Sequence, residues 1–190
     1  MASNKPNIFN TVLAKRPVSS TFDLCKKHRT TYNIGQLIPT YCTEVLPGDS
    51  FSIRQENMVR FAPLVAPIYH DVKVKTYWFF IPCRILWDNW EDFISPDNVT
   101  ERNIVWPHMV MTALDTIDND SLINYLDIPT ANLDMEQDLS VLPLAAYFKI
   151  YDEWFRNQHI QTVDQFETIT DGDNTGNYKP KAVAPPLNPN

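Results

Sequence analysis

The residue types that most often do chemistry are present in this sequence, but their spacing matches no catalytic or metal-binding pattern. The histidines and cysteines are scattered along the chain: His28, His70, His108, His159, Cys25, Cys42 and Cys83. None lies at the spacing of a zinc site, and HExxH, GxSxG, P-loop and GxGxxG motifs are absent from the sequence. The sequence therefore predicts no catalytic residues, no metal and no cofactor, and it predicts that the protein is not an enzyme.

One acidic segment resembles the front of a calcium-binding loop. Asp171, Gly172, Asp173 and Gly176 follow the order found at the start of an EF-hand. The twelfth position of that loop requires a glutamate that binds the ion through both carboxylate oxygens, and here it is Ala182. Because the ligand set is incomplete, we do not expect calcium to bind.

Positive charge is concentrated at the start of the chain. Residues 1–30 contain six basic side chains and one acidic side chain, which gives a formal charge of +5, while the remaining residues carry −12 and the whole chain −7. A basic arm of this kind either contacts phosphates and releases the cations condensed on nucleic acid, or is simply a solvated tail. The candidate contact residues are Lys15, Arg16, Lys26, Lys27 and Arg29.

Tryptophans and carboxylates support a different class of function. Trp87, Trp90 and Trp106 could stack on sugar rings, and acidic loops around Asp118 and Asp134 could supply an acid and a base for glycoside hydrolysis. A carbohydrate-binding module or a glycoside hydrolase requires these rings to face solvent beside two carboxylates. The competing interpretation is that the rings pack in a hydrophobic core, which the apolar sequence around Trp87 and Trp90 favours.

The elements that would position these residues are organised around residues 41–82. Apolar and polar side chains alternate in residues 51–61 and again in residues 71–81, which indicates two β-strands. Pro82 ends the second strand, because proline cannot donate a backbone hydrogen bond to a sheet. Residues 62–67 contain two prolines and are predicted to form the connection between the strands.

A tight turn is predicted before the first of these strands. Pro47 has a fixed φ and lies beside Gly48, the residue type that best tolerates positive φ. An apolar run from Ile34 to Val45 precedes the turn, so an antiparallel hairpin is expected. The outer edges of these strands must be covered by further strands, which suggests that these residues are the front part of a larger protein.

Helices are predicted to follow the strands. Residues 84–94 carry apolar side chains near helical spacing, and two shorter helical segments are expected in residues 106–116 and 121–126. Prolines separate these segments from one another.

The clearest predicted helix has Ser140 as its N-cap residue and Pro143 in its first turn. Asp152 and Arg156 lie one turn apart and are predicted to form an ion pair. The apolar stripe, which is typical of a helix packed on a sheet, consists of Leu144, Phe148, Tyr151 and Phe155.

The chain divides into four predicted parts: a basic arm (1–30), the first strands (31–82), a helical insertion (83–170) and an extended segment (171–190). With 190 residues, 44% of them hydrophobic, it is long enough to bury a core. No apolar run reaches the roughly 18 residues of a membrane span, and the start lacks the apolar core of a signal peptide. We therefore expect a protein that stays in the cell that makes it, with reduced cysteines.

Five segments in a fixed order carry a resemblance to a known family. They are FDL (22–24), NIGQLIPTYCTEVLPGDSFSIRQENMVRFAPLVAPIYHDV (33–72), FFIPCRILWDNWEDFI (79–94), SLINYLDIP (121–129) and LPLAAYFKIYDEWFRNQ (142–158). Over residues 20–180 the chain resembles the major capsid protein of the microviruses, which are small single-stranded DNA phages, and specifically its gokushovirus branch.

The resemblance implies a mainly β protein with helical insertions, namely a viral eight-stranded antiparallel jelly roll of which this chain supplies the first strands and an α-helical insertion. It implies pentamers that close a T=1 icosahedral shell around single-stranded DNA, contacts with other virion proteins, no membrane, and assembly in the host bacterial cytoplasm. The five candidate cations of the arm would then contact DNA or neighbouring subunits. The chain departs from the family in length, because members are far longer and carry the later strands and a surface loop that forms spikes.

Overall fold

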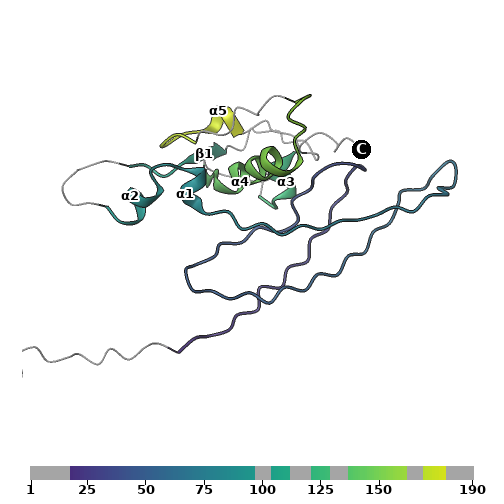
Figure 1. Ribbon diagram of the computed structural model, residues 1–190, viewed down its shortest axis with the longest axis horizontal. Coiled ribbons are helices and arrows are strands. Elements are labelled where there is room, and N and C mark those ends of the chain that lie inside the picture. The colour runs from purple at the N-terminus through teal and green to yellow at the C-terminus, as the bar shows by residue number, and fades with distance from the viewer. Residues whose placement is uncertain (1–17, 97–103, 112–120, 129–136, 162–168, 179–190) are drawn as a thin grey trace, which may run out of the picture.

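The computed structural model describes residues 18–96, 104–111, 121–128, 137–161 and 169–178. It contains two different kinds of structure (Figure 1). Residues 18–82 run as a long path of extended chain and turns, and the residues after Pro82 form short helices and a two-stranded sheet that gather into a small core. None of the described helices is long and apolar enough to cross a membrane.

The regular elements are short, and all of them follow Pro82. They are α1 (Cys83–Leu86), α2 (Trp90–Ile94), β1 (His108–Met111), α3 (Leu122–Tyr125), β2 (Gln137–Ser140), α4 (Leu142–Ile150), the π-helix η1 (Tyr151–Phe155) and α5 (Thr175–Tyr178). Strands β1 and β2 pair antiparallel, with His108 opposite Ser140 and Met111 opposite Gln137.

Strand β1 corrects the helix that was predicted for residues 106–116. Alternate side chains of β1 are buried, since Met109 and Met111 point into the core while His108 and Val110 are only half-buried. This period of two is that of a strand, and the backbone groups of β1 find their partners on β2. Residues 112–116 of the prediction lie outside the described residues.

The helix predicted around Pro143 is confirmed, with a different N-terminus. Its N-cap residue is Val141, and Pro143 lies in its first turn as expected. The hydroxyl of Ser140 accepts only a long hydrogen bond, 3.4 Å, from the backbone N–H of Leu142. The predicted stripe is also confirmed: Leu144, Phe148 and Tyr151 are buried, and Phe155 packs against the same cluster from its edge.

After α4 the backbone widens into η1 and then leaves the helix at Arg156, whose backbone is extended. The predicted pair of Asp152 and Arg156 forms here, with 3.3 Å between Arg156 Nε and Asp152 Oδ1, and both side chains are largely shielded from water. Arg156 Nη1 also donates to the backbone carbonyl of Gln161. The pair therefore ties the last helical turn to the chain that follows.

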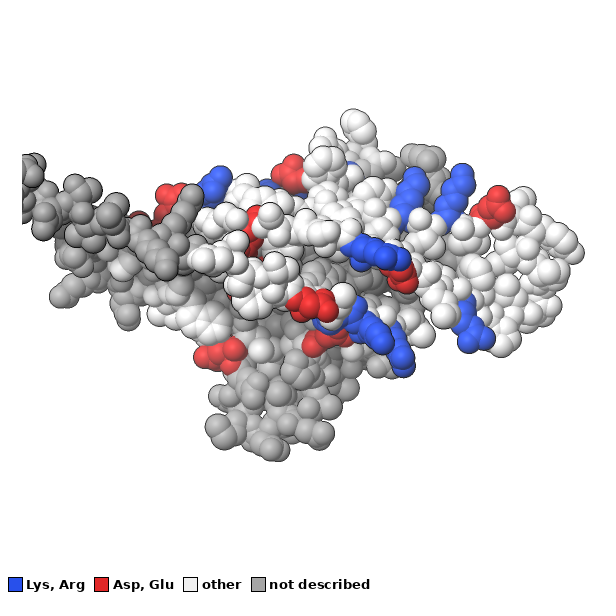
Figure 2. Space-filling view, turned by 90° about the horizontal axis from the view of Figure 1, so that it is seen from below, with Lys and Arg blue, Asp and Glu red and all other residues white. Residues whose placement is uncertain are grey.

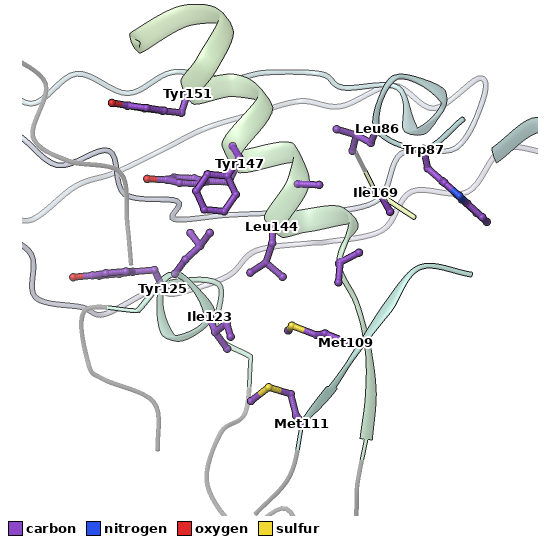
Figure 3. Close-up of a cluster of buried hydrophobic side chains, with 14 residues drawn as sticks. Leu86, Trp87, Met109, Met111, Ile123, Tyr125, Leu144, Tyr147, Tyr151 and Ile169 are labelled. Carbon is purple, nitrogen blue, oxygen red and sulfur yellow. The ribbon is translucent and has the colours of Figure 1, made fainter. Parts of the chain in front are cut away.

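The core is a single cluster around α4 (Figure 3). Leu144 of α4 points toward Met109 of β1 and Ile123 of α3, Tyr147 lies on the side of Tyr125, and Leu86 of α1 contributes from another side of the cluster. The buried members are Leu86, Trp87, Met109, Met111, Leu122, Ile123, Tyr125, Val141, Leu144, Ala145, Tyr147, Phe148, Tyr151 and Ile169. Burial of each large apolar side chain contributes about 1.5–3 kcal/mol, so this cluster holds the short elements together.

The helical prediction for residues 84–94 is corrected in one respect, because two short helices replace one. Helix α1 ends at Trp87, where the backbone becomes extended, and α2 begins only at Trp90. Trp87 turns into the core and is 2% exposed. The break in the helix is what allows this ring to reach the core.

The predicted turn at Pro47 and Gly48 is present, but the strands predicted on either side of it are not paired. Gly48 has a φ of 91°, and the backbone N–H of Asp49 donates to the carbonyl of Leu46 at 3.1 Å. In the described structure, residues 41–82 form no strand and pair with no neighbour. The prediction of two strands and a hairpin is therefore not met among the described residues, because a strand requires a hydrogen-bonded partner and this stretch has none there.

We predict that Leu144→Ala destabilises the core by about 2–5 kcal/mol, because it removes a fully buried side chain from a cluster that cannot collapse around the cavity. Leu64→Ala is the matched control, since Leu64 is exposed and the same atoms are removed. Both variants are compared with the parent chain by urea unfolding, followed by circular dichroism. Equal midpoints for the two variants would contradict the assignment of α4 as the centre of the core.

Candidate functional site

The largest candidate surface is residues 41–82, which we call the extended stretch. Its apolar side chains face solvent along most of its length. The large exposed members are Val45, Leu46, Phe51, Ile53, Met58, Val59, Phe61, Leu64, Val65, Ile68, Tyr69, Val72, Val74, Tyr77, Trp78 and Phe80. Monomeric proteins rarely leave so many neighbouring apolar residues exposed, so the extended stretch has the character of an interaction surface.

Aromatic contacts connect the end of the extended stretch to the core. The ring of Tyr77 meets the ring of Phe155 edge-on, with centroids 5.4 Å apart, and the ring of Phe79 lies 5.7 Å from that of Trp154. Trp154 is nevertheless 72% exposed. In residues 71–81 the side of the chain that carries Tyr77 and Phe79 therefore lies against η1. The opposite side, which includes Trp78 and Phe80, is exposed.

Residues 24–38, which we call the strap, lie against the core. Two tyrosine side chains of the core form hydrogen bonds with the backbone of the strap. The hydroxyl of Tyr125 donates to the carbonyl of Thr31 at 2.9 Å, and the hydroxyl of Tyr147 donates to the carbonyl of Leu37 at 2.8 Å. Leu37 and Ile38 pack against the hydrophobic cluster. These contacts fix the strap by its backbone, so its side chains are held in a defined orientation.

An ion-pair cluster fixes the basic part of the strap. The carboxylate oxygen Oδ2 of Asp127 lies 2.6 Å from Lys26 Nζ and 3.2 Å from His28 Nδ1. The hydrogen bond from Lys26 is the main reason that the pKa of Asp127 lies below its ordinary value, and the hydrogen bond from His28 adds to the effect. The carboxylate is thus ionised and engaged by two strap side chains.

The backbone of Asp127 explains its position. Its φ is 57°, in the left-handed region that few non-glycine residues adopt. The N–H of Asp127 donates to the carbonyl of Asn124, and the N–H of Ile128 donates to that of Ile123. This is the Schellman ending of α3, with aspartate where glycine is usual, and it turns the Asp127 carboxylate toward the strap.

The five predicted contact residues do not share one environment. Lys15 and Arg16 lie outside the described residues. Lys26 is paired with Asp127. Lys27 and Arg29 are exposed, and neither makes an ion pair with any other described residue. Of the three described cations, Lys26 is exposed but already engaged by a carboxylate, and Lys27 and Arg29 make no ion pair with a described residue.

The tryptophans do not form the sugar-binding platform that the second function class requires. Trp87 is buried, and its indole Nε1 donates to Asp171 Oδ1 at 2.7 Å. Trp90 is half-buried and meets the ring of Trp87 edge-on, with centroids 6.4 Å apart. Trp106 lies against the ring of His108. The hypothesis of a carbohydrate-binding module or glycoside hydrolase loses its supporting platform, because two of its three rings belong to the protein interior.

The segment that resembled a calcium loop is a structural clasp. Asp171 accepts hydrogen bonds from Trp87 and from Asn89 Nδ2, and Asp173 accepts from Thr175. Buried Asn174 bonds to Thr170 through both ends of its side-chain amide. Among the described residues no group of three or more His, Cys, Asp or Glu side chains is placed to hold a metal ion.

The clasp also extends the sheet and corrects the prediction of a wholly extended segment after residue 170. The N–H of His108 donates to the carbonyl of Gly172, and the N–H of Asn174 donates to the carbonyl of His108. Helix α5 then begins at Thr175. Sequence reasoning did not assign roles to Asn174 or Asp127, and neither residue has a local signal, because the partners of each lie far away in the chain or in the backbone of a turn.

These features define the class of the protein. It exposes a long apolar stretch beside a small core, and its acidic loop and tryptophans serve packing, which is the pattern of a structural protein that builds interfaces. A family model described as capsid protein (F protein) matches residues 9–181, and the chain belongs to this family. The resemblance to microvirus capsid proteins is thereby confirmed.

Individual relatives agree with the family assignment. The chain is 36% identical over 149 residues to capsid protein VP1 of Chlamydia phage 1, covering 75% of this chain and 25% of that protein. It is 32% identical over 133 residues to capsid protein VP1 of Bdellovibrio phage phiMH2K, and 27% identical over 139 residues to that of Spiroplasma virus 4. The matched region spans about a quarter of the length of each of these relatives.

We predict that Asp171→Asn destabilises the chain by about 1 kcal/mol, the difference between a charged and a neutral hydrogen bond, because the amide oxygen is a weaker acceptor for the buried indole. Asp88→Asn is the control, since Asp88 is an exposed carboxylate next to the same tryptophan. Urea unfolding monitored by tryptophan fluorescence measures both. A shift of the same size in the control would show that net charge, and not the clasp, causes the effect.

We also predict that acid loosens the strap. The pKa of Asp127 is lowered from 3.8 in the folded chain, so its ion pair contributes fully above about pH 4 and is lost as the pH falls through the lowered pKa. Amide hydrogen exchange of residues 24–38, corrected for intrinsic rates, should therefore accelerate on acidification. Asp127→Asn should remove this acid step and Asp138→Asn should retain it. An unchanged acid step in Asp127→Asn would refute the assignment.

Proposed function

We propose that this chain is part of the major capsid protein of a small icosahedral single-stranded DNA bacteriophage and that its function is structural. The family assignment and the relatives named as capsid protein VP1 support this proposal. The observation that carries it is the extended stretch, whose alternating apolar side chains are exposed and whose backbone has no sheet partner among the described residues. Such a surface serves assembly and has no use in a self-contained monomer.

The extended stretch supplies the first strands of a viral eight-stranded antiparallel jelly roll in this proposal, and the helices after Pro82 form an insertion beside it. Unpaired strand edges are normally covered or closed into a sandwich or barrel. The partners are further strands of the same kind of protein, because the relatives are about four times as long as the matched region. Pairing would satisfy the backbone and bury the face that contains Ile53, Val59 and Phe61.

Completed subunits are proposed to form pentamers and a closed T=1 shell in the virion, assembled in the host cytoplasm around packaged DNA and together with other virion proteins. Obligate interfaces of this kind are large and apolar. The basic arm (residues 1–30), which includes the first part of the strap, would contact DNA or neighbouring subunits. No catalysis and no cofactor enter this mechanism.

We predict that Ile53→Asp in the full-length protein abolishes assembly, whereas Ser52→Asp leaves it intact. Both side chains are exposed in the structure described here, so neither change disturbs the small core. In a sheet the two residues face opposite sides, and only Ile53 belongs to the apolar face. Analytical ultracentrifugation and negative-stain microscopy measure pentamers and shells. Equal behaviour of the two variants would count against the jelly roll, and a wild-type protein that stays monomeric would count against the capsid function.

A further inference from the structure

The strap separates its cations by the alternation of an extended chain. Lys26 and His28 both contact the Asp127 carboxylate, and their side chains are 41% and 11% exposed. Lys27 and Arg29 occupy the intervening positions and are exposed. Successive side chains of an extended segment point to opposite sides, so one pair of basic residues is directed to Asp127 and the other pair is directed away from it.

The register that produces this separation is held at three places along the strap. Asp127 binds it at Lys26 and His28, Tyr125 at the Thr31 carbonyl, and Tyr147 at the Leu37 carbonyl. A slip of one residue would turn Lys27 toward the core and Lys26 outward, and it would break all three contacts. The orientation of the cations is therefore a property of the fold.

Pairing decides how much each cation contributes to binding a polyanion. Figure 2 shows Lys and Arg side chains dispersed among Asp and Glu on one face of the molecule, with no uniformly basic area. A lysine that already neutralises a carboxylate adds little to the release of counterions from nucleic acid. Lys26 is in this state, whereas Lys27 and Arg29 are not paired with any described residue.

Aromatic side chains on both sides of the cations fit a single strand better than a duplex. Phe22 and Tyr32 are exposed and flank Lys27 and Arg29 in the sequence. Proteins that bind single strands combine basic residues along the backbone with aromatic rings on which unpaired bases stack. Residues 22–32, which include the first part of the strap, have both kinds of group within a short length of chain.

We propose that Lys27 and Arg29 form a phosphate-binding edge for single-stranded DNA and that Asp127 withholds Lys26 from that edge. The proposal rests on the capsid function proposed above, in which the partner is packaged DNA. It makes Asp127, a residue with no contact to the nucleic acid, a determinant of how strongly the strap binds.

The test measures binding of a fluorescein-labelled oligothymidylate to the full-length protein by anisotropy over a series of salt concentrations. The slope of log affinity against log salt concentration is negative, and each lost phosphate contact reduces its magnitude by about 0.7 for single strands. Lys27→Ala with Arg29→Ala should reduce this magnitude by about 1.4, which corresponds to roughly sevenfold less salt sensitivity between 50 and 200 mM. Lys26→Ala should leave the slope near that of the wild type.

Asp127→Asn provides the more discriminating test, because it should raise the affinity for the oligonucleotide. Asparagine also adopts the left-handed conformation, so the turn after α3 is kept while Lys26 is released. The magnitude of the slope should increase by about 0.7, and Lys26→Ala in the same protein should cancel this increase. Asp138→Asn removes one exposed carboxylate elsewhere and controls for the general loss of negative charge.

A wild-type protein that does not bind the oligonucleotide, an unchanged slope in the Lys27 and Arg29 double variant, or equal gains in Asp127→Asn and Asp138→Asn would each overturn the proposal. Shell formation is measured separately on the same proteins. Intact shells with unchanged slopes would refute the phosphate-binding edge and leave the capsid function standing. Slopes that change as expected in a protein that never assembles would support the edge and refute the capsid function.

Discussion

The buried face of α4 is the contact on which the other described elements depend. Helices of four or five residues, such as α1, α2 and α3, are too short to be stable alone, and a two-stranded sheet is marginal in water. Helices α1 and α3 and strand β1 gain stability by contributing buried side chains to the cluster that includes Leu144 and Phe148, whereas α2 has no fully buried residue and lies against α1. The same helix reaches the strap through the Tyr147 hydroxyl, so the position of the first described residues also depends on it.

The extended stretch has the opposite balance of forces. Its sequence has the alternation of a sheet, but its apolar side chains are exposed, which is unfavourable in water, and its backbone groups are left to solvent. Its last residues meet the core: Tyr77 and Phe79 contact aromatic rings of η1, and Ile81 packs against the hydrophobic cluster. The chain therefore combines a packed core with an exposed apolar surface, the extended stretch. The structural function proposed above uses such a surface for contacts with partners.

Local patterns predicted the features that depend on neighbours in sequence. Pro143, the spacing of the α4 stripe, the Asp152 pair and the turn at Gly48 could all be recognised, because a few consecutive residues determine them. Short apolar runs are ambiguous between helix and strand. The sequence predicts a helix where β1 lies, because it is the pairing with β2 that makes this segment a strand. The alternation of the extended stretch could be recognised in the sequence, but among the described residues the stretch forms no paired strand.

The candidate cations show why composition cannot define a binding site. The arm was recognised by its net charge, yet Lys26, Lys27 and Arg29 are equivalent in the sequence and different in the fold. The difference comes from Asp127, about a hundred positions away, which faces the strap because α3 ends in a left-handed residue. Ion pairs over short distances outweigh the net charge of the whole chain, since salt screens distant charges beyond roughly 8–10 Å. In the phosphate-binding edge proposed above, the contribution of each cation would be determined by whether the fold has already paired it with a carboxylate.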